Sequence, residues 1–480
     1  MPSLRTLPDF AQVQAEITAL FAERVNQGRA PACFFSVFDA EGTLFEGGFG
    51  HKTLGGAPPD RQTRFRIASC TKSFTIAALL TLRDAGKIVL DDPITAFVPA
   101  LRGTLPPSAP VVPTLRMLMA MSGGLPTDDP WADRQESLSR DAFLSVLESG
   151  VRFTTVPGSR FEYSNLGYAL LGQVVEQVSG RPFPDFVAET VLQPLGLRMT
   201  TFDHATVPPA QMAAGYRASR GAWRALLPSG PGAFSSIGGV ISTAEDLTKW
   251  AAWLCEAFRA DVPERGPLSA ASRREMQTIH CPIAAEPGED LLFKGYGFGL
   301  VAQTDARHGL TVHHSGGYPG FSSHMRWNPA AGVGVVAFEN ATYSGVLKPV
   351  AEALERLLGR AAPRPTAPEP PTDVAMLGRR VAELVAQWDD SLAGDLFLEN
   401  VAMDRPYAER AAELAELRAR VGTPDAERAE IRPADGHMFG SFEVRVPCTT
   451  GVIVGLVGLG PPEPARIQSI TFKIDQWVQW

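Results

Sequence analysis

A serine and a lysine lie three residues apart near the start of a predicted helix. Ser69 and Lys72 belong to residues 67–74, which read Ile-Ala-Ser-Cys-Thr-Lys-Ser-Phe. Side chains at this spacing share one helix face, so the amine lies beside the hydroxyl. A buried lysine has a lowered pKa and can accept the serine proton, whereas arginine stays protonated. The pair predicts a nucleophilic serine with a lysine base; the alternative is a capping serine beside a surface lysine.

Lysine is rare in this chain, so its positions are informative. Only seven of the 44 Lys and Arg residues are lysines, and Lys72 forms the only Ser-x-x-Lys. A lysine where arginine would serve a salt bridge equally well indicates a specific role. The helix that follows is apolar nearly all round over residues 76–82, which favours a buried Lys72. Backbone N–H groups at the start of this helix can also stabilise a developing oxyanion.

A tyrosine and an asparagine form the second candidate motif, Tyr163-Ser164-Asn165. A phenol held beside a lysine ammonium loses its proton more easily, so Tyr163 can act as a general base and later as a general acid. Asn165 can hydrogen-bond Lys72 or a substrate amide. The alternative interpretation is a loop whose asparagine caps a helix over residues 166–178.

The third motif, His313-His314-Ser315-Gly316-Gly317, ends a predicted strand. A glycine pair at a strand end allows a substrate backbone to approach closely. His314 can give a hydrogen bond or a charge to that substrate. The alternative is a hairpin turn with a packed histidine.

Together and in this order, Ser-x-x-Lys, Tyr-x-Asn and His-x-Gly resemble the serine β-lactamase and penicillin-binding-protein superfamily. Within it, the resemblance is to the class C-like branch, with D-aminopeptidases, D-amino-acid amidases and family VIII carboxylesterases. It covers about residues 10–360 and extends to four flanking segments, residues 86–93, 115–126, 238–246 and 318–321.

The resemblance implies a role for each residue of the three motifs. Ser69 is the nucleophile, and Lys72 with Tyr163 forms the acid–base pair. The backbone N–H groups of Ser69 and Gly317 form the oxyanion hole. The resemblance implies no metal and no cofactor. The residues it places against the substrate are Asn165, His314, Ser315 and Gly316.

One departure from the family pattern concerns the third motif. β-Lactamases and penicillin-binding proteins usually carry Lys-Thr-Gly where this chain has His314-Ser315-Gly316. An ordinary histidine, with a pKa near about 6.5, is mostly neutral at pH 7.5 and binds a carboxylate less strongly than an ammonium does. We therefore expect weak β-lactam turnover and a preference for substrates without a carboxylate beside the scissile bond. The lower kcat/KM expected for substrates with such a carboxylate should recover below about pH 6, as His314 gains its proton.

The motifs predict an acyl-enzyme on Ser69, formed from an amide, a peptide or an ester. The peptide can contain a D-amino acid. An acyltransferase, a transpeptidase or a peptide-cyclising enzyme would use the same acyl-enzyme with another acceptor. An alternative of another class is a non-catalytic sensor of penicillin-type ligands, which would be expected to lose Lys72 or Tyr163.

The surrounding patterns predict an α/β (α+β) fold with an antiparallel sheet flanked by helices, as in β-lactamases and transpeptidases. A helix from Asp9 to Gly28 precedes a hairpin, and strands return late in the chain before another helix. An all-helical lobe over roughly residues 100–300 is inserted between them. The predicted strands are residues 33–38, 43–49, 310–314, 322–327 and 333–338, and the late helix is residues 350–358.

A proline cluster divides the chain. We predict a hydrolase domain over residues 1–362, a stiff linker over 363–372, and a small α+β domain of unknown role over 373–480.

Composition narrows the remaining classes. The net charge is −8 with both signs interspersed, which indicates no nucleic-acid surface. The five cysteines form no Cys-x-x-Cys pair, so neither a disulfide framework nor a zinc site is predicted. No secretory signal or membrane span is evident, and a cytoplasmic protein without membrane contact is expected. The expected partner is a small ester, amide or peptide substrate; the oligomeric state is left open.

Overall fold

The computed structural model describes residues 9–102, 111–286, 292–361, 370–433, 440–461 and 464–475. The chain divides into two compact units, Met1–Ala361 and Ala362–Trp480. Residues 363–369 of the predicted linker lie outside the described residues. No described helix combines the length and the apolar character needed to cross a membrane.

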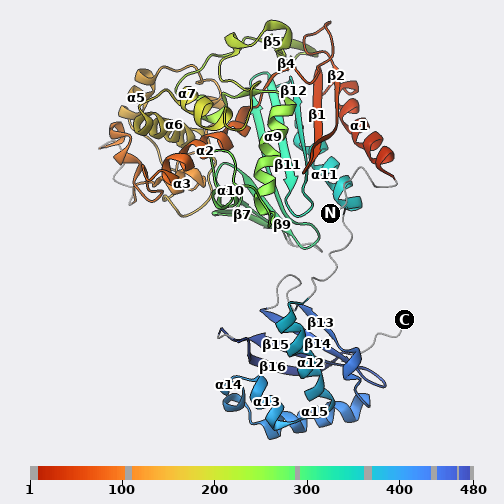
Figure 1. Cartoon of the computed structure of the whole chain (residues 1–480). Helices are drawn as coiled ribbons and strands as arrows, with labels where there is room; N and C mark the ends of the chain where they lie inside the picture. The colour runs from red at the N-terminus through yellow and green to blue at the C-terminus, as the bar shows by residue number, and fades with distance from the viewer. Residues whose placement is uncertain are drawn as a thin grey trace. The chain divides into compact units, whose positions relative to one another are not determined.

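The first unit is built on an eight-stranded sheet to which both ends of the unit contribute (Figure 1). Each strand is antiparallel to its neighbours. In sheet order, the strands are β2 (Gly42–Gly50), β1 (Ala32–Asp39), β12 (Val333–Glu339), β11 (Phe321–Asn328), β10 (Gly309–Tyr318), β9 (Val301–Asp305), β8 (Leu292–Tyr296) and β7 (Cys281–Glu286). The predicted hairpin is confirmed as β1 and the edge strand β2, and the predicted late strands are confirmed as β10, β11 and β12.

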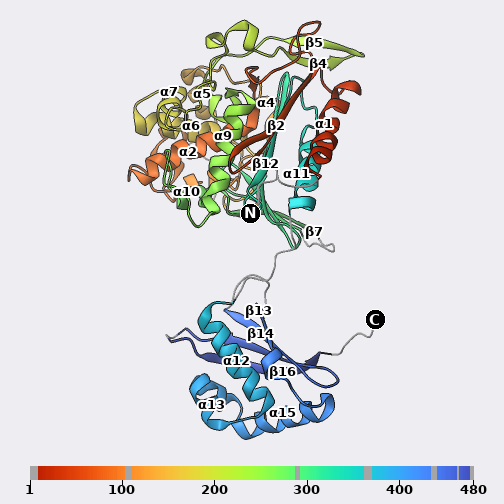
Figure 2. The same ribbon diagram turned by 45° about the vertical axis from the view of Figure 1, so that its right-hand side comes forward.

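Helices cover both faces of this sheet. The long helices α1 (Phe10–Asn26) and α11 (Leu347–Ala361) pack on one face, and α9 (Ala244–Cys255) packs on the other (Figure 2). Every residue of β1 is buried, as expected for a strand covered on both sides. Thr243 caps α9, because its hydroxyl accepts a hydrogen bond from the Asp246 N–H group.

The middle of the chain is mostly helical, but the prediction of an all-helical lobe over residues 100–300 was wrong. A hairpin, β4 (Gly215–Ser219) with β5 (Ala222–Leu226), lies inside it, and β7 and β8 extend the main sheet. Strand β7 was missed because Pro282 lies within it; this edge strand tolerates the proline beside a register shift. The helices here are α3 (Leu115–Met119), α4 (Asp129–Ala132), α5 (Arg140–Glu148), α6 (Asn165–Ser179), α7 (Phe183–Val187), α8 (Ser235–Gly238) and α10 (Ala270–Met276).

The predicted helix at Ser69 consists of a short 3-10 turn, Ala68–Cys70, followed by α2 (Thr71–Asp84). The two-residue strand β3 (Phe65–Arg66) leads into the turn and pairs with β6 (Ile241–Ser242). Ala68, directly before Ser69, has a φ of 48°, a conformation that costs energy for any residue with a Cβ atom. The chain therefore turns sharply to present the serine at the start of a buried helix.

The second unit is an α+β fold with its own apolar core. Its antiparallel sheet has the order β13 (Glu430–Pro433), β14 (Ser441–Pro447), β15 (Val452–Leu459) and β16 (Ile467–Asp475). Its helices are α12 (Thr372–Ala386), α13 (Asp390–Leu396), α14 (Glu399–Asp404) and α15 (Tyr407–Val421).

Candidate active site

Ser69 and Lys72 lie side by side at the start of α2. The Lys72 Nζ atom is 3.0 Å from the Ser69 Oγ atom, 2.7 Å from the Asn165 Oδ1 atom and 3.0 Å from the Ile237 carbonyl oxygen. Lys72 is completely buried. The alternative of a surface lysine is therefore wrong, and Ser69 lies on the floor of a pocket with little of its side chain exposed.

Burial controls the charge of Lys72. Desolvation lowers its pKa to about 8, although Asp133, Asp129 and Asp128 favour the charged form. A neutral lysine has two N–H donors and one lone pair. The oxygens of Asn165 and Ile237 can accept the two hydrogen bonds, which leaves the lone pair for the Ser69 hydroxyl. The geometry therefore suits an amine that removes a proton from Ser69.

Asn165 is the first residue of α6, and Tyr163 lies just before the helix. The helix is capped by Ser164, whose hydroxyl accepts a hydrogen bond from the Gly167 N–H group, so Asn165 is not the cap. Instead, the Asn165 side chain accepts from Lys72 and donates to Asp129 over 2.6 Å. The Asn165 and Leu166 N–H groups both donate to Asp128, which holds this end of α6 in place.

The Tyr163 hydroxyl is protonated in this environment. Its pKa is raised well above the usual value, chiefly by burial and by the charge of Asp129, while a hydrogen bond to Ser69 opposes the shift. Lys72 lies 5.1 Å from the centre of the Tyr163 ring. Since the pKa of Lys72 falls and that of Tyr163 rises, Lys72 can present a neutral amine near pH 8, whereas Tyr163 keeps its proton.

His314 lies at the site but is neutral, and the expected charge below pH 6 is wrong. Burial and the nearby Lys72 lower its pKa to about 3. Its Nδ1 atom lies 2.6 Å from the Ser315 carbonyl oxygen, so Nδ1 carries the proton. Its Nε2 atom accepts from the Tyr296 hydroxyl over 2.9 Å. Both ring nitrogens are therefore engaged, and the imidazole has no free donor for a substrate.

The glycines of the third motif are required by their neighbours. A Cβ atom on Gly316 would collide with the Ile67 carbonyl oxygen and the Ser323 hydroxyl, and one on Gly317 would collide with the Tyr343 ring. Strand β9 pairs with β10 only from Gly309 to His313. Within the described residues, the segment 315–318 therefore pairs with β11 on one side and is open on the other, as a substrate backbone requires.

A pocket of about 490 Å³ joins these residues. Its lining includes Ser69, Tyr163, His314, Ser315, Gly316 and Gly317. It also includes residues that the motif analysis did not assign to the site, namely Asp129, Lys294, Tyr296, His313 and Tyr343. The rarity of lysine was the one signal for Lys294. Nothing in the sequence pattern marks Tyr343, which comes from the segment after β12.

A buried ion pair ties the nucleophile turn to the helical part and to β10. Arg66, on β3, lies 2.6 Å from Glu136, and neither side chain is exposed. Glu136 also accepts hydrogen bonds from the hydroxyls of Ser229 and Tyr318, the last residue of β10. The carboxylate therefore holds three segments around the site.

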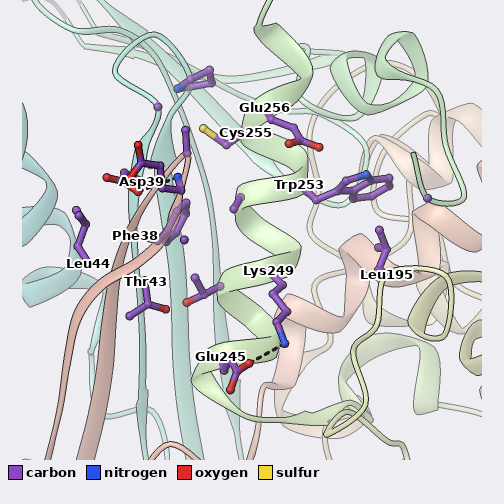
Figure 3. Close-up of a pocket in the computed structure, with 18 of the residues that line it drawn as sticks. Phe38, Asp39, Thr43, Leu44, Leu195, Glu245, Lys249, Trp253, Cys255 and Glu256 are labelled. Carbon is purple, nitrogen blue, oxygen red and sulfur yellow. Dashed lines mark hydrogen bonds and ion pairs between the residues drawn. The ribbon is translucent and has the colours of Figure 1, made fainter. Parts of the chain in front are cut away.

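A larger groove of about 850 Å³ lies elsewhere, between the β1–β2 hairpin and α9 (Figure 3). Two ion pairs lie in its lining: Lys249 lies 2.7 Å from Glu245, and Arg265 lies 2.7 Å from Glu256. Neither ion pair places a lysine amine beside a serine hydroxyl, as Lys72 lies beside Ser69. Among the described residues, no cluster of His, Cys, Asp or Glu could hold a metal ion.

Comparison with known proteins adds three similarities. A family model described as Beta-lactamase matches residues 17–360. The chain is 25% identical over 340 residues to Protein flp of Staphylococcus aureus (strain MW2), covering 68% of this chain and 63% of flp. It is 28% identical over 349 residues to D-alanyl-D-alanine-carboxypeptidase/endopeptidase AmpH of Escherichia coli (strain K12), covering 68% of this chain and 84% of AmpH. The alignment thus spans less than two thirds of flp.

A solved structure shares the fold. The octameric penicillin-binding protein homologue from Pyrococcus abyssi has a TM-score of 0.62 at 21% sequence identity, covering 94% of this chain and 91% of that one.

Proposed function

Because this chain belongs to the beta-lactamase family, whose members are serine hydrolases, we propose that it cleaves an amide, peptide or ester bond through an acyl-enzyme on Ser69. The observation that carries the proposal is the contact of 3.0 Å between Ser69 and a completely buried lysine. A serine hydroxyl is a weak nucleophile until a neighbouring group takes its proton.

In the acylation step, neutral Lys72 takes the Ser69 proton while the serine oxygen forms a bond to the substrate carbonyl carbon. The carbonyl oxygen gains the negative charge, and in this proposal the N–H groups of Ser69 and Gly317 stabilise it. When the tetrahedral intermediate collapses, the bond to the leaving group breaks and Tyr163 donates a proton to that group. The ammonium of Lys72 then returns a proton to Tyr163, so that Lys72 is again neutral and Tyr163 is again protonated.

In the second step, water attacks the acyl group on Ser69. Lys72 and Tyr163 can take the water proton and return one to the serine oxygen, so both groups end as they began. An amine in place of water would give acyl transfer or peptide cyclisation from the same intermediate. The acceptor therefore decides between hydrolysis and transfer.

The substrate class is proposed from the pocket and from the relatives. The open side of residues 315–318 suits an extended peptide, which can add to a strand edge by main-chain hydrogen bonds. AmpH is named as a carboxypeptidase and endopeptidase for D-alanyl-D-alanine. We therefore favour short peptides and amides, including those with a D-residue, over simple esters.

Labelling with a fluorophosphonate tests this proposal. The reagent should add to the wild-type protein at one site, read as a single mass increase, and the Ser69→Ala variant should gain nothing. A screen of D- and L-amino-acid amides against p-nitrophenyl esters then ranks the substrates. A wild-type protein that resists labelling, or that is labelled away from Ser69, would contradict the proposed nucleophile.

A further inference from the structure

A basic cluster lies beside the candidate nucleophile and has no assigned role. Lys294, on β8, and His313, on β10, line the same pocket as Ser69. The register of the sheet aligns Lys294 with Gln303 and Thr311, so Lys294 and His313 belong to the same face of the sheet. Burial lowers the pKa of His313 well below its usual value, and His324, Arg326 and, to a smaller extent, Lys294 lower it further.

The cluster continues behind the pocket. His313 is directly opposite Arg326 on β11, and Ser315 is opposite His324. The Ser315 hydroxyl lies 2.9 Å from the His324 Nδ1 atom. The ring centres of His313 and His324 are 5.4 Å apart. Basic side chains of this region therefore come from three strands of the sheet, β8, β10 and β11.

Several of these nitrogens are buried without a partner. Both ring nitrogens of His313 lack a hydrogen bond within the described part of the chain, and this residue is only 5% exposed. The Nε2 atom of His324 and the Nε atom of Arg326 are also unpartnered among the described residues. Burying such groups costs free energy, and a packed core histidine would normally be satisfied by a neighbour.

We propose that Lys294 and His313 form a subsite for a carboxylate group of the substrate, with Ser315 at its rim. A carboxylate accepts hydrogen bonds from an ammonium and from a neutral imidazole N–H group, and Arg326 supplies a further positive charge behind them. Among the described residues, no acidic side chain is hydrogen-bonded or ion-paired with Lys294. Within the described part of the chain, no ion pair therefore neutralises the Lys294 ammonium.

This inference rests on the proposed function and deepens it, because it makes the substrate an anionic peptide or acid. It also replaces the expectation of a preference for substrates without a carboxylate. That expectation rested on His314, which stands where β-lactamases and penicillin-binding proteins carry the lysine of Lys-Thr-Gly. In the proposed subsite, Lys294 of β8 supplies the positive charge instead.

Two matched ester pairs test the subsite. In the first pair, N-acetylglycine is esterified with 3-hydroxybenzoate or with its neutral isostere 3-hydroxybenzamide. In the second, the carboxylate is on the acyl side, with p-nitrophenyl hydrogen glutarate against the p-nitrophenyl ester of glutaramic acid. Each pair gives a ratio of kcat/KM, anionic over neutral, for the wild type, for Lys294→Met and for Lys294→Arg.

In at least one pair, Lys294→Met should lower this ratio about tenfold, because a charge-assisted hydrogen bond is roughly twice as strong as a neutral one. Lys294→Arg keeps the positive charge and should retain most of the ratio. Lys87→Met, which removes an exposed lysine after α2, should leave both ratios unchanged. Equal ratios in wild type and Lys294→Met for both pairs would overturn the subsite while labelling of Ser69 still succeeds. Failure of labelling and of all four esters would overturn the proposed function instead.

Discussion

The amine nitrogen of Lys72 lies 3.0 Å from the hydroxyl oxygen of Ser69, and the same nitrogen contacts Asn165 and the Ile237 carbonyl oxygen. The lysine is therefore held from three sides, by the 3-10 turn that contains Ser69, by α6 and by α8. A base that is held in this way needs no rearrangement before it accepts a proton.

Replacement of the nucleophile should abolish acylation. Ser69→Ala removes only one oxygen from a buried turn, so the protein should still fold, while kcat/KM for the best substrate falls by at least about 10³-fold. Intact mass after fluorophosphonate treatment and circular dichroism measure the two effects. Turnover within tenfold of wild type would exclude Ser69 as the nucleophile.

Lys72→Arg should be nearly as damaging as Lys72→Met. Arginine keeps the positive charge but has no removable proton, and the loss of a general base lowers the rate by about 10²–10⁴-fold. The control Lys87→Arg changes an exposed lysine and should have no effect. Substantial activity in Lys72→Arg would make the lysine a fixed cation and Tyr163 the base.

The pH profile of the wild type should report Lys72. Burial lowers its pKa to about 8, and the reactive form is the neutral amine. The value of kcat/KM for a neutral ester should therefore rise with pH between 6 and 8 and level off above about 8. A profile that is flat over this range would indicate that the lysine does not change its charge during the titration.

Acid should not improve the binding of anionic substrates. The pKa of His314 is lowered to about 3, so this histidine stays neutral at pH 5.5, and burial also lowers the pKa values of His313 and His324 well below their usual value. For 3-carboxyphenyl against 3-carbamoylphenyl esters, the ratio of kcat/KM should change less than twofold between pH 5.5 and 8. A tenfold increase on acidification through pH 6 would mean that one of these histidines gains a proton in the pocket.

The buried pair of Arg66 and Glu136 should be essential for stability. Glu136→Gln leaves an uncompensated guanidinium in a dry environment, which typically costs about 3–5 kcal/mol. Glu46→Gln disrupts the exposed pair with Arg61 and should cost less than about 1 kcal/mol. The urea concentration at which half of the protein loses Ser69 labelling compares the two variants. Similar midpoints would show that the buried pair contributes little.

The division into two domains stays a prediction, which limited proteolysis can test. Proteinase K should cut first between Ala361 and Asp373, and the fragment that contains Ser69 should keep its fluorophosphonate labelling. The two units have separate apolar cores, which is the reason to expect an active fragment. Early cuts elsewhere, with residues 361–373 protected, would contradict an exposed linker.

Much of the site was predictable because its chemistry depends on local spacing. Ser69 and Lys72 occupy one helix face, and Tyr163 and Asn165 are only two residues apart, so each motif carries its own geometry. The outer strands were not predictable in this way. Strand β7 contains Pro282, and β8 is short and half-exposed, so neither shows the alternation typical of a strand.

The charge of His314 and the place of Lys294 depend on long-range packing. Nothing near His314 in the sequence indicates that Tyr296 and the Ser315 carbonyl group engage both its nitrogens. Lys294 reaches the pocket only because β8 and β9 join the sheet beside β10. The sequence pattern could give the residue types, but burial and strand order decide what those residues do.

The one-sided pairing of residues 315–318 also bears on the solubility of the folded protein. Unpaired backbone in a sheet is a template on which another chain can add and aggregate. Here the unpaired stretch is short, contains two glycines, and lies against Tyr343 in a recess of the surface. The unpaired stretch is too short for a long strand of another molecule to pair with, but it is long enough for a short peptide. The same geometry that would admit a substrate therefore leaves little edge for a strand of another molecule to extend.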